Sequence, residues 1–123
     1  MTLLLVGAGG FLGAISRYVI DGWVSSLTGG KFPWGTLVVN LSGSFVLGLL
    51  FALSVERASI SSSIRAPVLI GFVGAYTTFS TLSLESWRLV EDGSWAPGMG
   101  NLAGSMVLGL VAVVAGLTLG RAL

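Results

Sequence analysis

The sequence predicts an all-α integral membrane protein with four transmembrane helices. Hydrophobic residues make up 54% of the 123 residues and charged residues only 9%, whereas a soluble domain carries about 25% charged residues. A helix needs roughly 20 residues to cross a bilayer, so four helices with short connections use the whole chain. We therefore expect a single four-helix domain over residues 1–123, with the lipid bilayer as its surroundings.

The four expected helices alternate with polar connections that hold most of the charges. The first begins without a basic segment, so we interpret it as a membrane helix and not as a cleaved signal peptide. The third carries Pro67 in its first turn, where proline is well tolerated. The expected helices cover Leu3–Val24, Gly35–Val55, Ala66–Val90 and Gly98–Gly120.

The third helix is expected to break near mid-membrane. Residues 71–83 contain two glycines, three threonines and two serines, and both glycine and β-branched threonine weaken a helix. Non-helical backbone persists at membrane depth only where it is buried in protein or faces a water-filled cavity. Broken helices often mark ion sites in transport proteins, so this segment is the first candidate for function.

Basic residues are almost evenly divided between the two ends of the expected bundle. Arg57, Arg65 and Arg121 fall on the side of both termini, and Lys31 and Arg88 fall on the opposite side. Basic loops favour the cytoplasmic side, and three against two is a weak preference. Two interpretations stay open: a fixed orientation, or insertion both ways with head-to-tail pairing of two chains.

The composition excludes several classes of function. The chain has no cysteine and no histidine, which removes disulfides, thiol chemistry and the commonest general base. No nucleophile–base pair, deep carboxylate pair or metal cluster is visible, so we expect no enzyme. The net charge of +1 gives no basic field that would attract nucleic acid.

Uncharged hydrogen-bonding side chains form stripes on two of the helices. Thr36, Asn40 and Ser44 share one face of the second helix, and Asn101 and Ser105 lie one turn apart on the fourth. Such groups either join helices by hydrogen bonds or line a polar path. Asn40 is costly to bury without partners, which makes it the stronger functional candidate.

Two charged residues lie close to or within the expected spans. Arg17 has two structural options, pairing with Asp21 or reaching the membrane surface with its charged end. Glu85 follows Thr81 by one turn and ends the polar run of the third helix. Ionisable residues inside spans are candidates for function, and a structural role remains open for both Arg17 and Glu85.

Small residues four positions apart predict close helix packing. Such pairs are Gly9 and Gly13, Gly100 and Gly104, Gly116 and Gly120, and also Ser44 and Gly48. Glycines at this spacing allow the backbones of membrane helices to approach each other. The pairs predict a tightly packed bundle with room for a partner chain.

Three stretches together resemble the Fluc/CrcB family of fluoride channels. They are Gly9–Tyr18, Pro33–Asn40 and Gly71–Thr81, followed by Gly104-Ser105 in the last helix. The resemblance implies an antiparallel, dual-topology homodimer in the inner (plasma) membrane, in which each chain crosses the membrane several times. Each dimer would have two pores through which cytoplasmic fluoride leaves the cell down its gradient.

The resemblance also implies roles for particular residues. Backbone carbonyls of Gly74 and Thr77 are expected to hold one structural sodium ion at the dimer centre, and glycine is expected at 74 because of unusual dihedral angles. The pore side chains that match the family pattern are Phe79, Asn40, Thr78, Ser80 and Ser105.

The sequence departs from the family pattern at two positions. Leu82 stands where a second phenylalanine is common, and Asn101 stands where a hydroxyl is usual on the fourth helix. Leu82 leaves open an altered permeation, or a subunit that pairs with a paralogous chain instead of a second copy of itself.

Two other functions compete with the channel. A small proton-coupled or multidrug exporter also fits four helices in an antiparallel dimer, but it needs a titratable carboxylate in the membrane, and Glu85 is the only candidate. A non-transporting membrane scaffold would explain the glycine pairs but not the polar, interrupted third helix.

Overall fold

The computed structural model describes residues 1–123 as helices joined by short connections. The third transmembrane segment is composed of several pieces, and the second ends in a wider, π-helical turn, η1. Four segments are long and apolar enough to cross a membrane, which confirms the expected number. In order, the elements are α1 (Thr2–Thr28), α2 (Trp34–Phe51), η1 (Ala52–Glu56), α3 (Ser62–Arg65), η2 (Ala66–Val73), α4 (Gly74–Tyr76), α5 (Phe79–Glu91) and α6 (Trp95–Ala122).

The predicted interruption of the third segment is confirmed. Between α4 and α5 the backbone becomes extended, with ψ 158° at Thr77 and φ −149°, ψ 120° at Thr78. The two residues lie between a π-helical stretch with a short helix and the regular helix α5. The interruption is therefore a two-residue extended link, shorter than the polar run that predicted it.

Helix ends differ from the expected bounds by a few residues. Helix α1 continues to Thr28 instead of ending at Val24, and the hydroxyls of Ser26 and Thr28 donate to carbonyls one turn back, at 2.6 and 3.0 Å. The third segment begins at Ser62 instead of Ala66, where the side chain of Ser61 accepts the N–H of Ser63 and caps the first turn. The Ser61 side chain thereby satisfies an N–H that the start of a helix otherwise leaves open.

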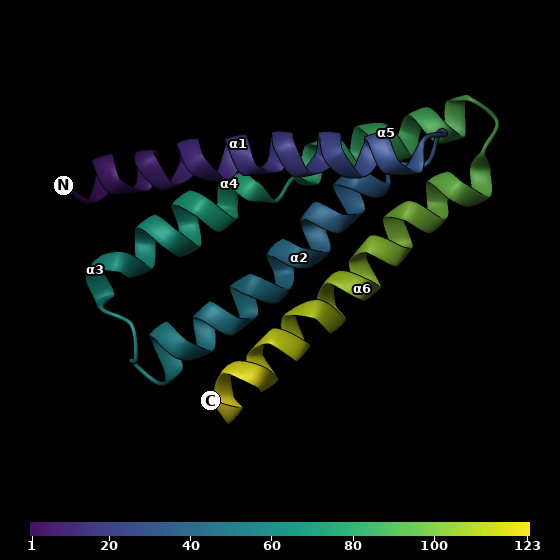
Figure 1. Cartoon of the computed structure of the whole chain (residues 1–123). Helices are drawn as coiled ribbons and strands as arrows, with labels where there is room; N and C mark the ends of the chain where they lie inside the picture. The colour runs from purple at the N-terminus through teal and green to yellow at the C-terminus, as the bar shows by residue number, and fades with distance from the viewer.

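The helices form two packed pairs that diverge toward one end (Figure 1). Helix α1 packs along η2 and α4, while α2 packs along α6, and α5 lies against α6. The N-terminus, α3 and the C-terminus lie at the end where the pairs diverge, and the connections α1–α2 and α5–α6 lie at the other end. This arrangement places the interruption between the two ends of the bundle, beside α2.

Close helix contact depends on the glycine pairs. A Cβ at Gly9 or Gly13 would overlap the backbone carbonyls of η2, and a Cβ at Gly116 would overlap the carbonyl of Phe45 on α2. The predicted role in tight packing is confirmed for these glycines but not for Gly100 and Gly104, where nothing lies within 4 Å of an added Cβ. Backbone packing of this kind stabilises membrane helices, whose apolar side chains gain little by leaving lipid.

The exterior is apolar, whereas the small interior combines glycines, polar side chains and a few apolar ones. Only 20 of 123 residues are buried, and five of these are polar side chains. Large apolar residues on α1 and α6 are exposed, among them Phe11 at 66% and Met106 at 63%. In water such a surface would aggregate, whereas in a bilayer it is covered by acyl chains or by a partner chain.

Gly116→Ala is expected to destabilise the α2–α6 pair, because its Cβ meets backbone that cannot rotate away. Overpacking of this kind costs about 1–3 kcal/mol, measurable as a lower midpoint of thermal unfolding in detergent. Gly7→Ala is the matched control, since nothing lies within 4 Å of the added Cβ. Equal stability of the two variants would show that α2 and α6 do not pack backbone to backbone.

Candidate functional site

A groove of about 330 Å³ opens beside the interruption of the third segment. It is enclosed by α2 on one side, by the link and α5 on another, and by α6 on the third. Five of the six side chains predicted to line a pore meet in it, although they come from three separate parts of the sequence. The groove is lined by Asn40, Gly43, Ser44, Leu47, Thr77, Thr78, Phe79, Leu82, Ser105, Met106 and Gly109.

Thr78 caps helix α5 and gives the groove a hydroxyl. Its Oγ1 accepts the backbone N–H of Thr81 at 3.2 Å and donates to the hydroxyl of Thr81 at 3.1 Å. A threonine at this position satisfies one of the free N–H groups of the first turn. Ser80, also predicted for the pore, is exposed and lies outside the groove, with its hydroxyl 3.5 Å from that of Thr78.

Asn40 uses both ends of its amide on one residue of the interruption. Its Oδ1 accepts the N–H of Thr78 at 2.8 Å, and its Nδ2 donates to the carbonyl of Thr78 at 2.9 Å. The expected cost of burying an unpaired amide is thereby avoided. One N–H of Nδ2 remains beyond this pair, because a primary amide has two, and Asn40 also lines the groove.

The interruption leaves backbone carbonyls without their usual helical partners. The N–H of Thr78 would bond the carbonyl of Gly74 in a continuous helix but donates to Asn40, and the N–H of Thr81, which would serve Thr77, donates to Thr78 Oγ1. Free carbonyl oxygens are ligands that a hard cation prefers. The two positions predicted for sodium, Gly74 and Thr77, therefore fit an oxygen-bound cation in their chemistry.

The expected reason for glycine at position 74 is wrong. Gly74 has ordinary helical angles, φ −61° and ψ −39°, which any residue adopts. A Cβ there would meet only the carbonyl of Leu69, at 3.8 Å. Space rather than dihedral angle distinguishes this position, because the face of Gly74 is open.

Arg17 reaches the other side of the interruption. Its Nε donates to the carbonyl of Ala75 at 3.1 Å, across 58 residues of sequence. The two expected structural options, pairing with Asp21 and reaching the membrane surface, are both replaced by this contact. The ion pairs of the chain are Lys31–Asp92 and Glu56–Arg121.

Phe79 and Leu82 both line the groove but differ in exposure. The Phe79 side chain is 73% exposed, while Leu82 is 5% exposed. Phe79 therefore presents its ring beyond the chain's own packing, and Leu82 forms part of the floor. A single chain leaves the groove uncovered on the side of Phe79.

Helix α6 adds a buried polar cluster next to the groove. Asn101 donates to the hydroxyl of Ser86 at 2.9 Å, and Ser105 donates to Asn101 at 3.5 Å. Asn101 and Ser86 are almost fully buried, and Ser105 is 8% exposed. Ser86 was not predicted as a site residue. It lies four positions after Leu82 and so on the same face of α5, and this spacing could have identified it.

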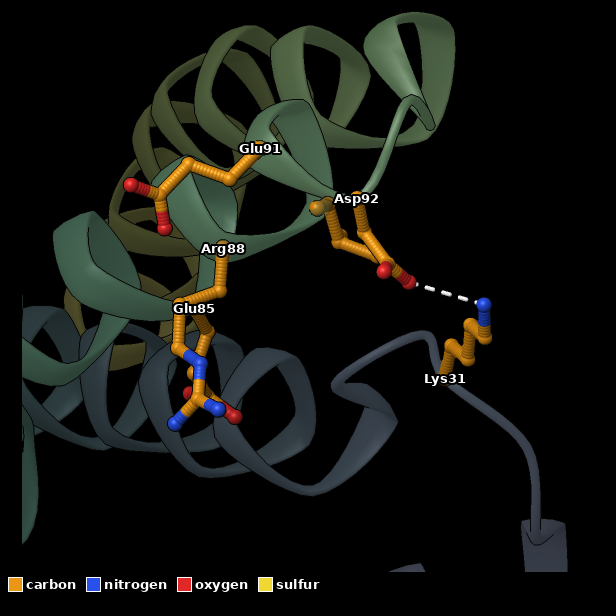
Figure 2. A pocket seen from close by; sticks show the side chains of 6 residues that line it. Lys31, Glu85, Arg88, Glu91 and Asp92 are labelled. Carbon is orange, nitrogen blue, oxygen red and sulfur yellow. Dashed lines mark hydrogen bonds and ion pairs between the residues drawn. The ribbon is translucent and has the colours of Figure 1, made fainter.

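A second, charged hollow of about 500 Å³ lies at the end where α5 stops, lined by Lys31, Glu85, Arg88, Leu89, Glu91 and Asp92 (Figure 2). Glu85 and Arg88 extend to one side of α5, while Glu91 points away from the Lys31–Asp92 pair. Glu85 accepts a hydrogen bond from Thr36 on α2, one turn from Asn40. The stripe predicted on α2 thus runs from this hollow to the groove.

Lys31 and Asp92 join the α1–α2 connection to the end of α5 at 2.7 Å (Figure 2). The hydrogen bond from Lys31 holds the pKa of the Asp92 carboxyl below its usual range, and the same bond raises the pKa of Lys31. The stability that the pair adds to the folded chain is lost as pH falls through the lowered pKa of Asp92. On the alkaline side it is lost as pH rises through the raised pKa of Lys31.

Comparison with known proteins gives one family. Residues 4–117 match the family described as CrcB-like protein, Camphor Resistance (CrcB). A fluoride-specific ion channel FluC of Hahella chejuensis is 49% identical over 119 residues, which cover 97% of this chain and 94% of the relative. The FluC of Magnetococcus marinus is 45% identical over 121 residues, 98% of each chain. The FluC of Rhizobium meliloti is 42% identical over 121 residues, 98% of this chain and 97% of the relative.

Replacing Lys31 should return the pKa of Asp92 toward the ordinary value. In Lys31→Met the carboxyl loses its hydrogen bond, so its pKa is expected to rise toward that of an unpaired aspartate, measured by NMR titration of the side-chain carboxyl carbon in detergent. Lys31→Arg retains a charged donor and should keep the pKa low. If Lys31→Met leaves the titration unchanged, the two connections are not joined by this pair in solution.

Proposed function

The chain belongs to the CrcB-like family, whose similar members named above are fluoride-specific ion channels, and from this premise we propose that it is a subunit of a fluoride channel. It lets cytoplasmic fluoride leave the cell down its gradient, across the inner (plasma) membrane that its four spans cross. The observation that carries the proposal is the groove in which Asn40, Thr78, Phe79, Leu82 and Ser105 meet. The chain is not an enzyme.

The chemistry of the groove suits a small anion. Fluoride holds its hydration water strongly, so a pore must replace that water with close hydrogen-bond donors. The free N–H of Asn40 is such a donor, and the hydroxyl of Ser105 becomes one when it turns from its 3.5 Å contact with Asn101 toward the groove. No lysine or arginine lines the groove. Conduction needs binding that is favourable enough for entry and weak enough for release, and neutral donors meet this condition.

Phe79 supplies an aromatic contact beside the amide and hydroxyl donors. The edge of an aromatic ring carries partial positive charge, so a ring that presents its edge attracts an anion without trapping it. Leu82 offers only hydrocarbon at the position where a second ring is common. The anion is then held by Phe79 and by the neighbouring donors, with a weaker site beside Leu82.

A second copy of the chain, inserted in the opposite orientation, completes the unit. Phe79 is 73% exposed beside an open groove, and a partner that covers it closes a path in each half of an antiparallel dimer. The single four-helix domain thus contributes to two pores. A paralogous chain in place of the second copy is the alternative that Leu82 leaves open.

A structural sodium ion at the dimer centre is part of the same proposal. The carbonyls of Gly74 and Thr77 would hold it, because the interruption removes their helical donors. The ion would supply positive charge where carbonyl dipoles from two chains converge. Gly74 leaves open space on this face, which a partner's backbone needs for close approach.

A proton-coupled or multidrug exporter is the second candidate function. It rests on Glu85, the carboxylate that accepts a hydrogen bond from Thr36 within a predicted span. Glu85 lines the charged hollow and not the groove, which places it at the mouth of the path. A non-transporting scaffold needs no groove at all. Flux measurements on purified protein separate the three functions.

Phe79→Ile is expected to reduce fluoride efflux from liposomes by at least about tenfold, which is roughly 1.4 kcal/mol at the barrier. The substitution removes the polarised ring edge and keeps a hydrophobic side chain. Leu82→Phe should keep or raise the flux, because it restores a ring to the same groove. Flux is measured with a fluoride electrode and divided by the amount of dimer seen by size-exclusion chromatography.

Phe11→Ile is the matched control, since Phe11 is exposed on α1 and does not line the groove. Normal flux of dimeric Phe79→Ile would remove the ring from the permeation path. Absence of fluoride flux in the unchanged protein, with proton flux driven by an exported compound, would favour the exporter.

Both orientations in the membrane are expected for a chain whose basic residues divide three against two. Tags at either terminus, probed on intact and on opened cells, should each be accessible in part of the population. Adding two lysines to one connection is expected to fix the orientation. A single orientation in the unchanged chain would exclude an antiparallel dimer of identical subunits and leave a paralogous partner.

A further inference from the structure

The interruption of the third segment is held by side chains from two other helices. Arg17 comes from α1 and contacts Ala75, two residues before the link, and Asn40 comes from α2 and contacts the link itself. Each contact joins parts of the chain that are far apart in sequence, by 58 and 38 residues. The extended link is therefore defined by tertiary contacts and not by its own sequence.

The contact of Asn40 fixes the direction of the link. A primary amide has the same donor and acceptor as a peptide group, and its two bonds to Thr78, at 2.8 and 2.9 Å, match those of a neighbouring β-strand. Two bonds to the N–H and C=O of one residue restrain both groups together. Rotation of the Thr78 peptide out of this plane would break at least one bond.

The contact of Arg17 fixes the end of the helix before the link. The last carbonyls of a helix lack donors, and a basic side chain there both bonds a carbonyl and interacts favourably with the helix dipole. Nε of Arg17 takes the carbonyl of Ala75 at 3.1 Å. Gly13, one turn earlier on α1, packs against the carbonyl of Phe72 and keeps the two backbones close.

The groups left free lie around these two contacts. The carbonyl of Gly74 precedes the Arg17 contact, and the carbonyl of Thr77 lies between it and the Asn40 contact. The direction of both oxygens follows from the positions of Ala75 and Thr78, because neighbouring peptide groups in the chain share Cα atoms. The hydroxyl of Thr78, which caps α5, is set by the same backbone.

We propose that Arg17 and Asn40 are positioning residues that hold the backbone of residues 75–78 and thereby aim the free carbonyls and the Thr78 hydroxyl. Arg17 acts through the carbonyl of Ala75, and Asn40 acts through the peptide groups of Thr78 in addition to lining the groove. The consequence for fluoride flux rests on the proposed function. The restraint of the backbone is independent of the proposed function, and it is measured separately.

Amide hydrogen exchange of residues 74–80 in the purified full-length protein tests the restraint directly. In Asn40→Leu both bonds are lost, and exchange at Thr78 is expected to rise by about tenfold, as the loss of two hydrogen bonds implies. Ser44→Ala is the matched control: Ser44 lines the same groove one turn along α2 but makes no bond to the link, so exchange at Thr78 should not change.

Asn40→Asp keeps the size of the side chain and covers the case in which the leucine variant fails to fold. A carboxylate still accepts from the N–H of Thr78 but repels its carbonyl, so flux should fall while the amide of Thr78 stays protected to within about threefold. Loss of flux in Asn40→Leu without any change in exchange would mean that Asn40 acts only on the ion, and it would overturn the proposal for this residue.

Arg17 is tested by rescue. Arg17→Met removes the donor and should raise exchange across residues 76–80, whereas Arg17→Lys retains a donor to the Ala75 carbonyl and should restore protection and flux to within about threefold of the unchanged protein. Equal exchange in both variants and the unchanged protein would overturn the role of Arg17. If exchange rises as expected but the unchanged protein carries no fluoride, the restraint stands and the channel function fails.

Discussion

The pairing of the Asn40 amide with the backbone of Thr78 is the interaction on which the rest of the site depends. A membrane offers no water to satisfy an open N–H or C=O, so a helix can be interrupted there only where another group takes over its bonds. Asn40 does this with a donor and an acceptor held on a continuous helix. The groove, the cap of α5 and the free carbonyls all follow from the direction that this pair gives the link.

Glycine packing makes that pairing reachable. The side chain of Asn40 is short, so α2 must lie close to the interruption, and Gly43 on the next turn of α2 lies directly against the side chains of Thr77 and Tyr76. The hydroxyl of Tyr76 bonds that of Ser42 at 2.9 Å and adds a further tie between the two segments. On the other side of α2, Gly116 brings α6 near enough to place Ser105 in the groove.

The membrane fold was predictable from residue type, and most of the groove from the resemblance to the fluoride-channel family. Asn40, Thr78, Phe79 and Ser105 were expected to share a path, and they line one groove. The sequence pattern also placed the interruption within residues 71–83. It misassigned Arg17, whose partner is a backbone carbonyl 58 residues away, and it gave a wrong reason for Gly74, whose dihedral angles are ordinary. Neither a carbonyl partner nor open space at a glycine has a side-chain signature.

The sequence by itself determined that the protein lies in a membrane, that it has four spans, and that the third span has a segment of low helix propensity. These properties depend on composition and local propensity alone. Tertiary structure decided where the backbone leaves the helix. Several of the glycines and threonines from 71 to 83 weaken a helix equally, yet the link forms only at Thr77 and Thr78, where Asn40 from α2 replaces the lost backbone partners and Arg17 from α1 holds the preceding carbonyl. A contact across tens of residues is a property of packing, and no local pattern contains it.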